Sequence, residues 1–276
     1  MDAHVHIHDC FGLQAFFDRA YENFGSVARQ HGWSSPLGVL MLTESIDSSY
    51  FSQLMAIART SGSALNGQST EWLPLRTGES LSILMRKRDA EMVVIAGRQV
   101  VTSEAMEVLM LGTDQVPRDG CSLQHVLNLG QRLGSLQVIP WGAGKWFFKR
   151  GRILRELMDS ESRTSFYLGD QGGRPGFWST PEHLKKAFER GERVLSGSDP
   201  LPFPEEVERV GSFGFMTKFD IDLDEPVASL KSHLSRVNTE LTRFGKPQRP
   251  LQFFHNQTRM QLLKRKKPSS VPRPEY

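Results

Sequence analysis

Short apolar runs alternate with longer amphipathic stretches along most of the chain. Apolar runs of this length are typical of parallel strands that are buried on both faces, with helices packed outside them. We expect strands over residues 1–7, 37–44, 91–101, 107–112, 136–142, 164–170, 193–199 and 211–219. The amphipathic stretches predict helices over residues 12–31, 47–60, 121–134, 150–160, 180–190 and 225–244.

This alternation predicts an α/β fold, a TIM-like barrel of seven or eight strands with helices on the outside. Residues 71–112 break the rhythm, because several apolar runs follow one another there with no helix between them. We expect an antiparallel β-hairpin excursion in that region. No low-complexity linker interrupts the chain, so we predict a single domain over 1–262 and a basic, proline-containing tail over 263–276.

The composition is that of an ordinary folded protein, with 38% hydrophobic and 24% charged residues. No apolar run reaches the roughly 18 residues of a membrane helix, and no basic-then-apolar leader is present, so we expect a cytoplasmic protein without a membrane partner. The two cysteines, Cys10 and Cys121, are too few for a disulfide framework. The net charge is only +3, and "KRKK" at 264–267 is interpreted as a solvated tail, which makes nucleic acid an unlikely partner.

The first ten residues, "MDAHVHIHDC", place histidines at alternate positions. Alternate side chains of a strand share one face, so Asp2, His4, His6 and His8 would point the same way. Two imidazoles at this spacing can converge on one cation, which favours His4 and His6 as metal ligands. The alternative is a polar strand end whose histidines have no common function.

Three carboxylates follow apolar runs later in the chain: Glu44, Asp170 and Asp199. Active sites of barrels lie at the carboxyl ends of the strands, so these positions are candidates for chemistry. We expect Glu44 and Asp199 to join the histidines as metal ligands, with Asp199 also catalytic, and Asp170 to act as the general base. Each acid could instead cap the helix that follows it.

Two glycine-rich segments suggest how a substrate is held. "PWGAGKWFFKRG" contains Trp141 and Lys145, and "GDQGGRPGFW" contains Arg174. Cationic side chains in turns of this kind bind phosphate or carboxylate groups, so we expect these three residues to bind an anionic small molecule. Tight turns with solvated cations and packing tryptophans are the alternative.

The opening D-x-H-x-H pattern and the later "GSDP" resemble motifs of metal-dependent hydrolases, either the amidohydrolase superfamily or the polymerase-and-histidinol-phosphatase (PHP) family. "VVIAGRQVVTSEAMEVLMLG" is more similar to the PHP family. The resemblance implies a distorted seven-stranded barrel, a cluster of up to three metal ions and hydrolysis of phosphate esters. His4 and His6 match the first motif of the family, and Asp199 matches the last.

Several family ligands are replaced in this chain. Gln99 stands where the family has a bridging glutamate, Ser45 follows Glu44 in place of a histidine, and Trp141 stands where a histidine–proline pair is usual. We therefore expect one or two ions of zinc, manganese or iron. The function implied is a phosphoesterase that uses a metal-activated water. The alternative is a degenerate PHP-like barrel that binds a ligand or partner without catalysis.

Overall fold

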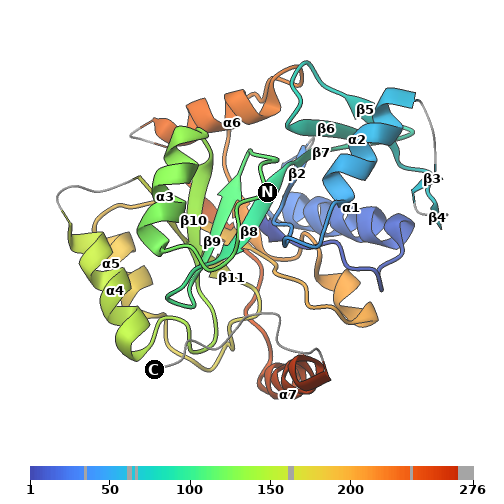
Figure 1. Cartoon of the computed structure of the whole chain (residues 1–276). Helices are drawn as coiled ribbons and strands as arrows, with labels where there is room; N and C mark the ends of the chain where they lie inside the picture. Colours follow the sequence, from blue (N-terminus) through green and yellow to red (C-terminus); the bar gives the residue numbers. More distant parts are fainter. Residues whose placement is uncertain (34–35, 61–63, 66–67, 161–164, 237–238, 267–276) are drawn as a thin grey trace.

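The protein has a mixed α/β fold in which helices lie outside two β-sheets (Figure 1). The computed structural model describes all residues except 34–35, 61–63, 66–67, 161–164, 237–238 and 267–276. None of the helices in those described ranges is long and apolar enough to cross a membrane.

The first sheet has five strands in the order β1-β2-β7-β6-β5. Its first three strands run parallel, whereas β7, β6 and β5 pair antiparallel. The strands are β1 (Asp2–Val5), β2 (Gly38–Leu42), β5 (Leu73–Arg76), β6 (Ser82–Lys87) and β7 (Ala90–Ile95).

The second sheet also has five strands, in the order β12-β11-β10-β9-β8. Strands β12, β11 and β10 are parallel, and β10, β9 and β8 are antiparallel. The strands are β8 (Gly97–Val101), β9 (Glu107–Leu111), β10 (Leu136–Pro140), β11 (Tyr167–Gln171) and β12 (Val194–Gly197). The antiparallel excursion expected over 71–112 is therefore present, and it is shared between the two sheets.

The predicted strand over 91–101 is divided at Ala96, where the chain passes from the first sheet to the second. A Cβ atom at Gly97 would lie 2.3 Å from the carbonyl oxygen of Leu42, so this close crossing requires glycine. Beside it, the Glu44 amide donates to the Gly97 carbonyl (3.1 Å) and the Gln99 amide donates to the Glu44 carbonyl (2.9 Å).

The sheets also meet at a second place, where the Asp199 amide donates to the His4 carbonyl (2.8 Å). These contacts join the edges of the sheets at β1 with β12 and at β2 with β8. In the described residues the strands nevertheless form separate sheets, and the closed barrel of seven or eight strands expected from the sequence is not found. Antiparallel pairing of β8 with β9 and of β9 with β10 replaces part of the expected repeat of parallel strands and helices.

Helices follow most of the predicted ranges. They are α1 (Leu13–Gln30), α2 (Tyr50–Thr60), α3 (Leu123–Arg132), α4 (Phe148–Asp159), α5 (Glu182–Glu189), α6 (Pro226–Ser235) and α7 (Pro250–Lys266), with a short 3-10 helix over Pro204–Arg209. The structure also contains two small hairpins, formed by β3 (Ala64–Leu65) with β4 (Gln68–Ser69) and by β13 (Gly214–Met216) with β14 (Thr242–Phe244).

The largest differences from the sequence prediction lie near the C-terminus. The helix expected over 225–244 ends at Ser235, because residues 242–244 pair with β13 instead. Helix α7 was not predicted, and it extends through residues 263–266 of the predicted tail. The rest of that tail, 267–276, lies outside the described residues.

Three apolar clusters form the core. One lies between the first sheet and helices α1 and α2, and another lies between the second sheet and helices α3, α4 and α5. The third contains inward-facing residues of both sheets and of α6, including Val39, Met41, Leu109, Leu195 and Leu230. Strand β2 is buried over its whole length, as expected for a parallel strand covered on both faces. This packing brings the carboxyl ends of β1 and β12 together.

Candidate metal site

The two N-terminal histidines converge at the end of β1. His4 is the third residue of the strand and His6 follows its end, and their Nε2 atoms lie 3.2 Å apart. The Oε1 atom of Gln99 lies 3.1 Å from Nε2 of His4. The alternation read from the sequence thus places both imidazoles on one side, and Gln99 lies beside them.

Asp199 reaches the same point from the end of β12. Its Oδ1 atom lies 3.5 Å from Nε2 of His4 and 3.6 Å from Nε2 of His6. One ligand atom from each of the three residues lies within 4.8 Å of the others, an arrangement that could hold a metal ion. Residues nearly two hundred positions apart are therefore brought together as the sequence motifs predict.

The backbone at Asp199 is strained, because its φ of +47° lies in the left-handed region. The amide of the same residue donates to the His4 carbonyl, which fixes the turn against β1. Non-glycine residues in this conformation are concentrated at functional sites, where the surrounding structure holds them. The turn directs the Asp199 carboxylate toward the imidazoles.

The protonation of the cluster suits a cation. Burial and the neighbouring His4 lower the pKa of His6 to about 3, so the His6 imidazole is neutral at pH 7. Burial raises the pKa of Asp199, but electrostatic interactions with His4, His6, Lys145 and Arg209 oppose it and bring the pKa below its ordinary value. Neutral imidazole and ionised carboxylate are the forms that bind metals, and this mixed nitrogen and oxygen set fits zinc, manganese or iron. The residues present therefore fit one divalent ion.

Asp2 and His8, which share the alternating pattern, have other contacts. The buried Asp2 carboxylate accepts hydrogen bonds from the backbone amides of His4 (3.2 Å), Ser198 (2.8 Å) and Gly211 (3.0 Å). Burial raises the pKa of Asp2 to about 6. Nε2 of His8 donates to the Pro200 carbonyl (2.9 Å). Asp2 and His8 thus connect the start of the chain to the segment around Asp199.

Glu44 is not one of the residues in this cluster. Its carboxylate lies 3.2 Å from Nη1 of Arg98 and accepts a hydrogen bond from the Phe51 amide (3.0 Å), near the start of α2. Burial raises the pKa of Glu44, although Arg98 and the Phe51 amide act in the opposite direction. The structure therefore shows Glu44 near a helix start, as in the capping alternative, and paired with a buried arginine.

Asp170 and Arg174 bind each other. Nε and Nη2 of Arg174 donate to the two Asp170 carboxylate oxygens (2.8 and 3.1 Å), and Arg243 donates a further hydrogen bond (2.9 Å). Asp170 and Arg174 are both nearly inaccessible, with exposed fractions of 2% and 3%. The sequence assigns one to proton transfer and the other to substrate binding, whereas the structure joins them in one ion pair.

The loop that follows β10 contains the other two predicted substrate residues. Lys145 forms an ion pair with Glu107, and its charge helps to lower the pKa of Asp199. Trp141 is buried and packs edge-on against Trp178, with ring centroids 6.0 Å apart. Lys145 thus lies on the metal-site side of the loop, and Trp141 belongs to a group of aromatic residues.

Sequence reasoning did not identify Thr43 as part of this site. Its hydroxyl lies 3.4 Å from Nε2 of His6 and donates to the Val5 carbonyl (3.1 Å). The only sequence signal was its position directly before Glu44, at the end of an apolar run. Gln99, in contrast, was singled out from the sequence as a replaced ligand, and it does contact His4.

No protein-family model and no curated protein matches the chain. Solved structures do show similarity. PsfC from Pseudomonas syringae PB-5123 has 12% sequence identity and a TM-score of 0.51, with 95% of this chain and 97% of that chain covered. This likeness shows a shared fold.

Two further similar structures are of endonuclease Q. The lesion-specific endonuclease PfuEndoQ from Pyrococcus furiosus has 11% identity and a TM-score of 0.49, with 87% of this chain and 56% of that chain covered. A complex of endonuclease Q with a 27-mer duplex that contains an abasic lesion has 11% identity and a TM-score of 0.43, with 84% and 55% covered.

These comparisons correct one expectation. The sequence reasoning that made nucleic acid an unlikely partner is wrong as an exclusion, because the similar structures include a nuclease bound to DNA. That reasoning relied on the absence of a familiar nucleic-acid-binding module from the sequence. One fold can bind different classes of ligand, however, because the ligand is determined by the residues of the site. The likeness to PsfC extends to the fold alone, and the PHP resemblance of the sequence stays a prediction.

Proposed function

We propose that this protein is a metal-dependent hydrolase of phosphate esters, with a distorted PHP-like barrel as its scaffold. The observation that carries the proposal is the convergence of His4, His6 and Asp199, whose ligand atoms lie within 4.8 Å of one another. A largely buried group of two imidazoles and one carboxylate, brought together from the ends of β1 and β12, is a costly arrangement unless a cation compensates the charge.

In this proposal His4, His6 and Asp199 hold one divalent ion, either zinc, manganese or iron. When bound, the ion would supply Lewis acidity and lower the pKa of a water molecule toward neutrality. The two imidazoles would offer lone pairs from Nε2, and the Asp199 carboxylate would supply negative charge. The Gln99 amide oxygen, 3.1 Å from His4, is a further neutral donor at the same point.

The number of unpaired carboxylates beside the histidines favours a single metal ion. Gln99 is neutral, and the Glu44 carboxylate is paired with Arg98 at 3.2 Å, so Asp199 is the one carboxylate of the group that we assign to the metal. Asp170 pairs with Arg174 and Arg243, which makes it a poor proton acceptor. Lys145 is paired with Glu107, but its ammonium group also acts on Asp199 and can attract a phosphate group to the ion, so we assign substrate contact to it.

The proposal is tested by metal analysis and by activity on the same preparations. Full-length protein purified without chelator should contain about one transition-metal ion per chain, and the His4→Ala and Asp199→Asn variants should bind metal at least about 100-fold more weakly. Calorimetric titration with Zn²⁺ and Mn²⁺ measures this. Matched controls are His125→Ala on α3 and Asp220→Asn, two exposed positions outside the cluster.

Hydrolysis is measured with p-nitrophenyl phosphate, its diester and a single-stranded oligonucleotide, each with added manganese or zinc. We expect release of product from at least one ester and its loss in Asp199→Asn. Protein that binds metal but hydrolyses none of the three would support the degenerate barrel, in which the site binds a ligand without catalysis. Protein that binds neither metal would remove the basis of the proposal.

A further inference from the structure

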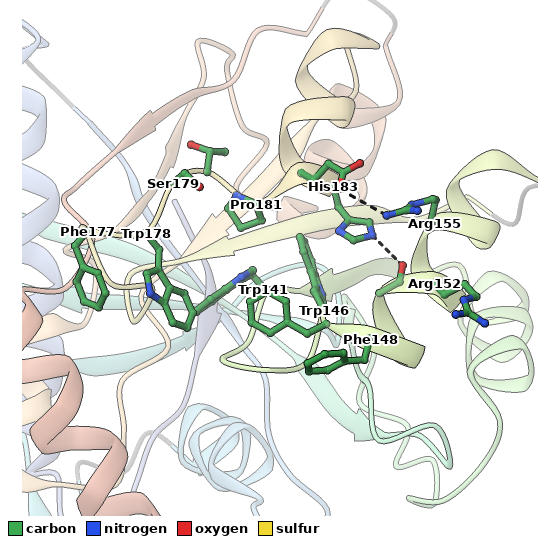
Figure 2. Close-up of a pocket in the computed structure, with 14 residues that line it drawn as sticks. Trp141, Trp146, Phe148, Arg152, Arg155, Phe177, Trp178, Ser179, Pro181 and His183 are labelled. Carbon is green, nitrogen blue, oxygen red and sulfur yellow. Dashed lines mark hydrogen bonds and ion pairs between the residues drawn. The ribbon is translucent and has the colours of Figure 1, made fainter.

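A second feature lies on the other side of the loop that follows β10. A cavity of about 730 Å³ opens between the starts of α4 and α5, a size usual for small-molecule sites. Aromatic side chains form much of its wall: Trp141, Trp146, Phe147, Phe148, Phe177 and Trp178. Figure 2 shows these rings extending from Phe177 and Trp178 at one side to Phe148, with Arg152 and Arg155 at the opposite side.

Close contacts join the elements that form the wall behind the cavity. Nε2 of His183 donates to the Gly151 carbonyl (2.9 Å), and its ring packs edge-on against Trp146 at 5.6 Å. A Cβ atom at Gly151 would lie 2.4 Å from the Trp146 carbonyl oxygen, so glycine is required for this close approach. These contacts hold α4, α5 and the tryptophan together before any ligand arrives.

Two side chains of the aromatic wall are unusual for a folded protein. The indole Nε1 atom of Trp146 is buried and has no hydrogen-bond acceptor within the described structure, although buried tryptophans usually have one. Phe148 is 95% exposed at the edge of the cavity, and its φ of +54° is strained for a bulky residue. A planar ring bound against Phe148 would remove that side chain from solvent.

The two arginines add a positive end to the cavity. Arg152 and Arg155 are exposed residues on one side of α4, and Arg155 lies 3.6 Å from Glu182 in a solvent-exposed pair. Exposed pairs of this kind are weak, so the Arg155 guanidinium can exchange Glu182 for a phosphate group. Flat aromatic walls with arginine beside them are the combination that stacks bases and binds their phosphates.

The cavity and the metal site share one loop. Residues 141–147 contribute Trp141, Trp146 and Phe147 to the cavity, whereas Lys145 of the same segment acts on Asp199. The Trp141 amide donates to the Gly169 carbonyl (2.8 Å), which fixes the start of this segment to β11. A ligand bound in the cavity therefore lies against the loop that supplies Lys145.

We propose that this cavity binds the base and a phosphate of a nucleoside phosphate, with the base against Trp178 and Phe148 and the phosphate at Arg152 and Arg155. The inference rests on the proposed function, because it names the substrate class of that hydrolase.

The test is calorimetric binding of AMP to the full chain in EDTA, with adenosine and ribose 5-phosphate as partial ligands. We expect AMP to bind more tightly than either fragment. Phe148→Ala and Trp178→Ala should weaken AMP binding about 10-fold or more, since base stacking depends on these rings. Trp178→Phe, which keeps a ring, should stay within about threefold.

Arg155→Ala should weaken AMP about 10-fold and leave adenosine unchanged, because adenosine has no phosphate. Phe188→Ala and Arg132→Ala are the controls, since both positions are exposed and outside the cavity wall. The inference would be overturned if AMP did not bind at millimolar concentration, or if ribose 5-phosphate bound as tightly as AMP. It would also be overturned if Phe148→Ala and Trp178→Ala weakened AMP binding no more than Phe188→Ala does.

The inference and the proposed function can fail separately. Suppose that the protein has no hydrolytic activity, and that AMP binding is lost in Phe148→Ala and Trp178→Ala but unchanged in His4→Ala. This result would support the nucleotide cavity and overturn the proposed hydrolase. Hydrolysis of phosphate esters with AMP binding insensitive to Phe148, Trp178 and Arg155 would support the hydrolase and overturn the cavity assignment.

Discussion

Two neighbouring parallel strands, β11 and β12, each have an aspartate near their carboxyl end, and the two aspartates have different surroundings. Asp170 is bound by Arg174 at 2.8 Å and by Arg243 at 2.9 Å. Asp199 lies 3.5 and 3.6 Å from the imidazole nitrogens of His4 and His6. The same sequence pattern, an acid after an apolar run, therefore produces an ion pair in one case and a candidate metal ligand in the other.

The difference arises from the side chains that face each carboxylate. Arginine is protonated at every accessible pH, so the charge of Asp170 is compensated within the folded chain. His6 is neutral because burial and the neighbouring His4 lower its pKa to about 3, and a neutral imidazole leaves the negative charge of Asp199 for an external cation. Lys145 and Arg209 act on Asp199 without forming an ion pair with it, so an acid at a strand end is available for chemistry where no arginine or lysine pairs with it directly.

The largest effect is expected from removing the cation on the Asp170 side. Arg174→Met leaves the Asp170 carboxylate buried with only Arg243 to compensate it, and should lower the free energy of unfolding by about 3 kcal/mol. Chemical denaturation followed by circular dichroism measures this loss.

Arg190→Met is the matched control for that change, because Arg190 forms an exposed pair with Asp159 at 2.5 Å. Exposed pairs contribute little, so the loss should be much smaller. Equal losses in the two variants would mean that the buried pair does not stabilise the fold, and the contrast between Asp170 and Asp199 would then disappear.

A smaller effect is expected from supplying the cation on the Asp199 side. Mn²⁺ or Zn²⁺ at 100 times its dissociation constant should raise the free energy of unfolding by about 2.7 kcal/mol, because the metal binds only the folded state. Thermal unfolding with metal and with EDTA measures the shift.

The Asp199→Asn variant should fold normally and show no such shift. Asparagine tolerates the φ of +47° at this position but has no negative charge to hold the ion. A metal-dependent shift that persists in Asp199→Asn would place the binding site elsewhere.

The smallest effect is expected at Gln99, whose Oε1 atom lies 3.1 Å from His4. Gln99→Glu would place a second carboxylate beside the histidines and should raise metal affinity about 10-fold, equal to about 1.4 kcal/mol. Titration calorimetry of the variant and the parent decides this. Unchanged affinity would show that Gln99 does not face the ion.

The sequence predicted most of the regular structure and the centre of the candidate site. The apolar runs gave strands where β2, β9, β10 and β12 lie, and strict alternation placed His4 and His6 on one side of β1. It did not predict the change of sheet at Ala96 or the pairing of β13 with β14, because those depend on contacts between segments distant in the chain. Hydrophobic periodicity indicates which face of a strand is buried, but it does not indicate which strand pairs with it.

The sequence alone determined which donor atoms are present: alternate histidines at the start, and carboxylates after buried runs. Only the tertiary structure decided which of them meet. It set Asp199 against His4 and His6, gave Glu44 to Arg98 and Asp170 to Arg174, and gathered aromatic residues from two loops around one cavity. The physical reason is that electrostatic and hydrogen-bonding partners are chosen by distances of a few ångströms, which packing sets after the backbone pattern is fixed.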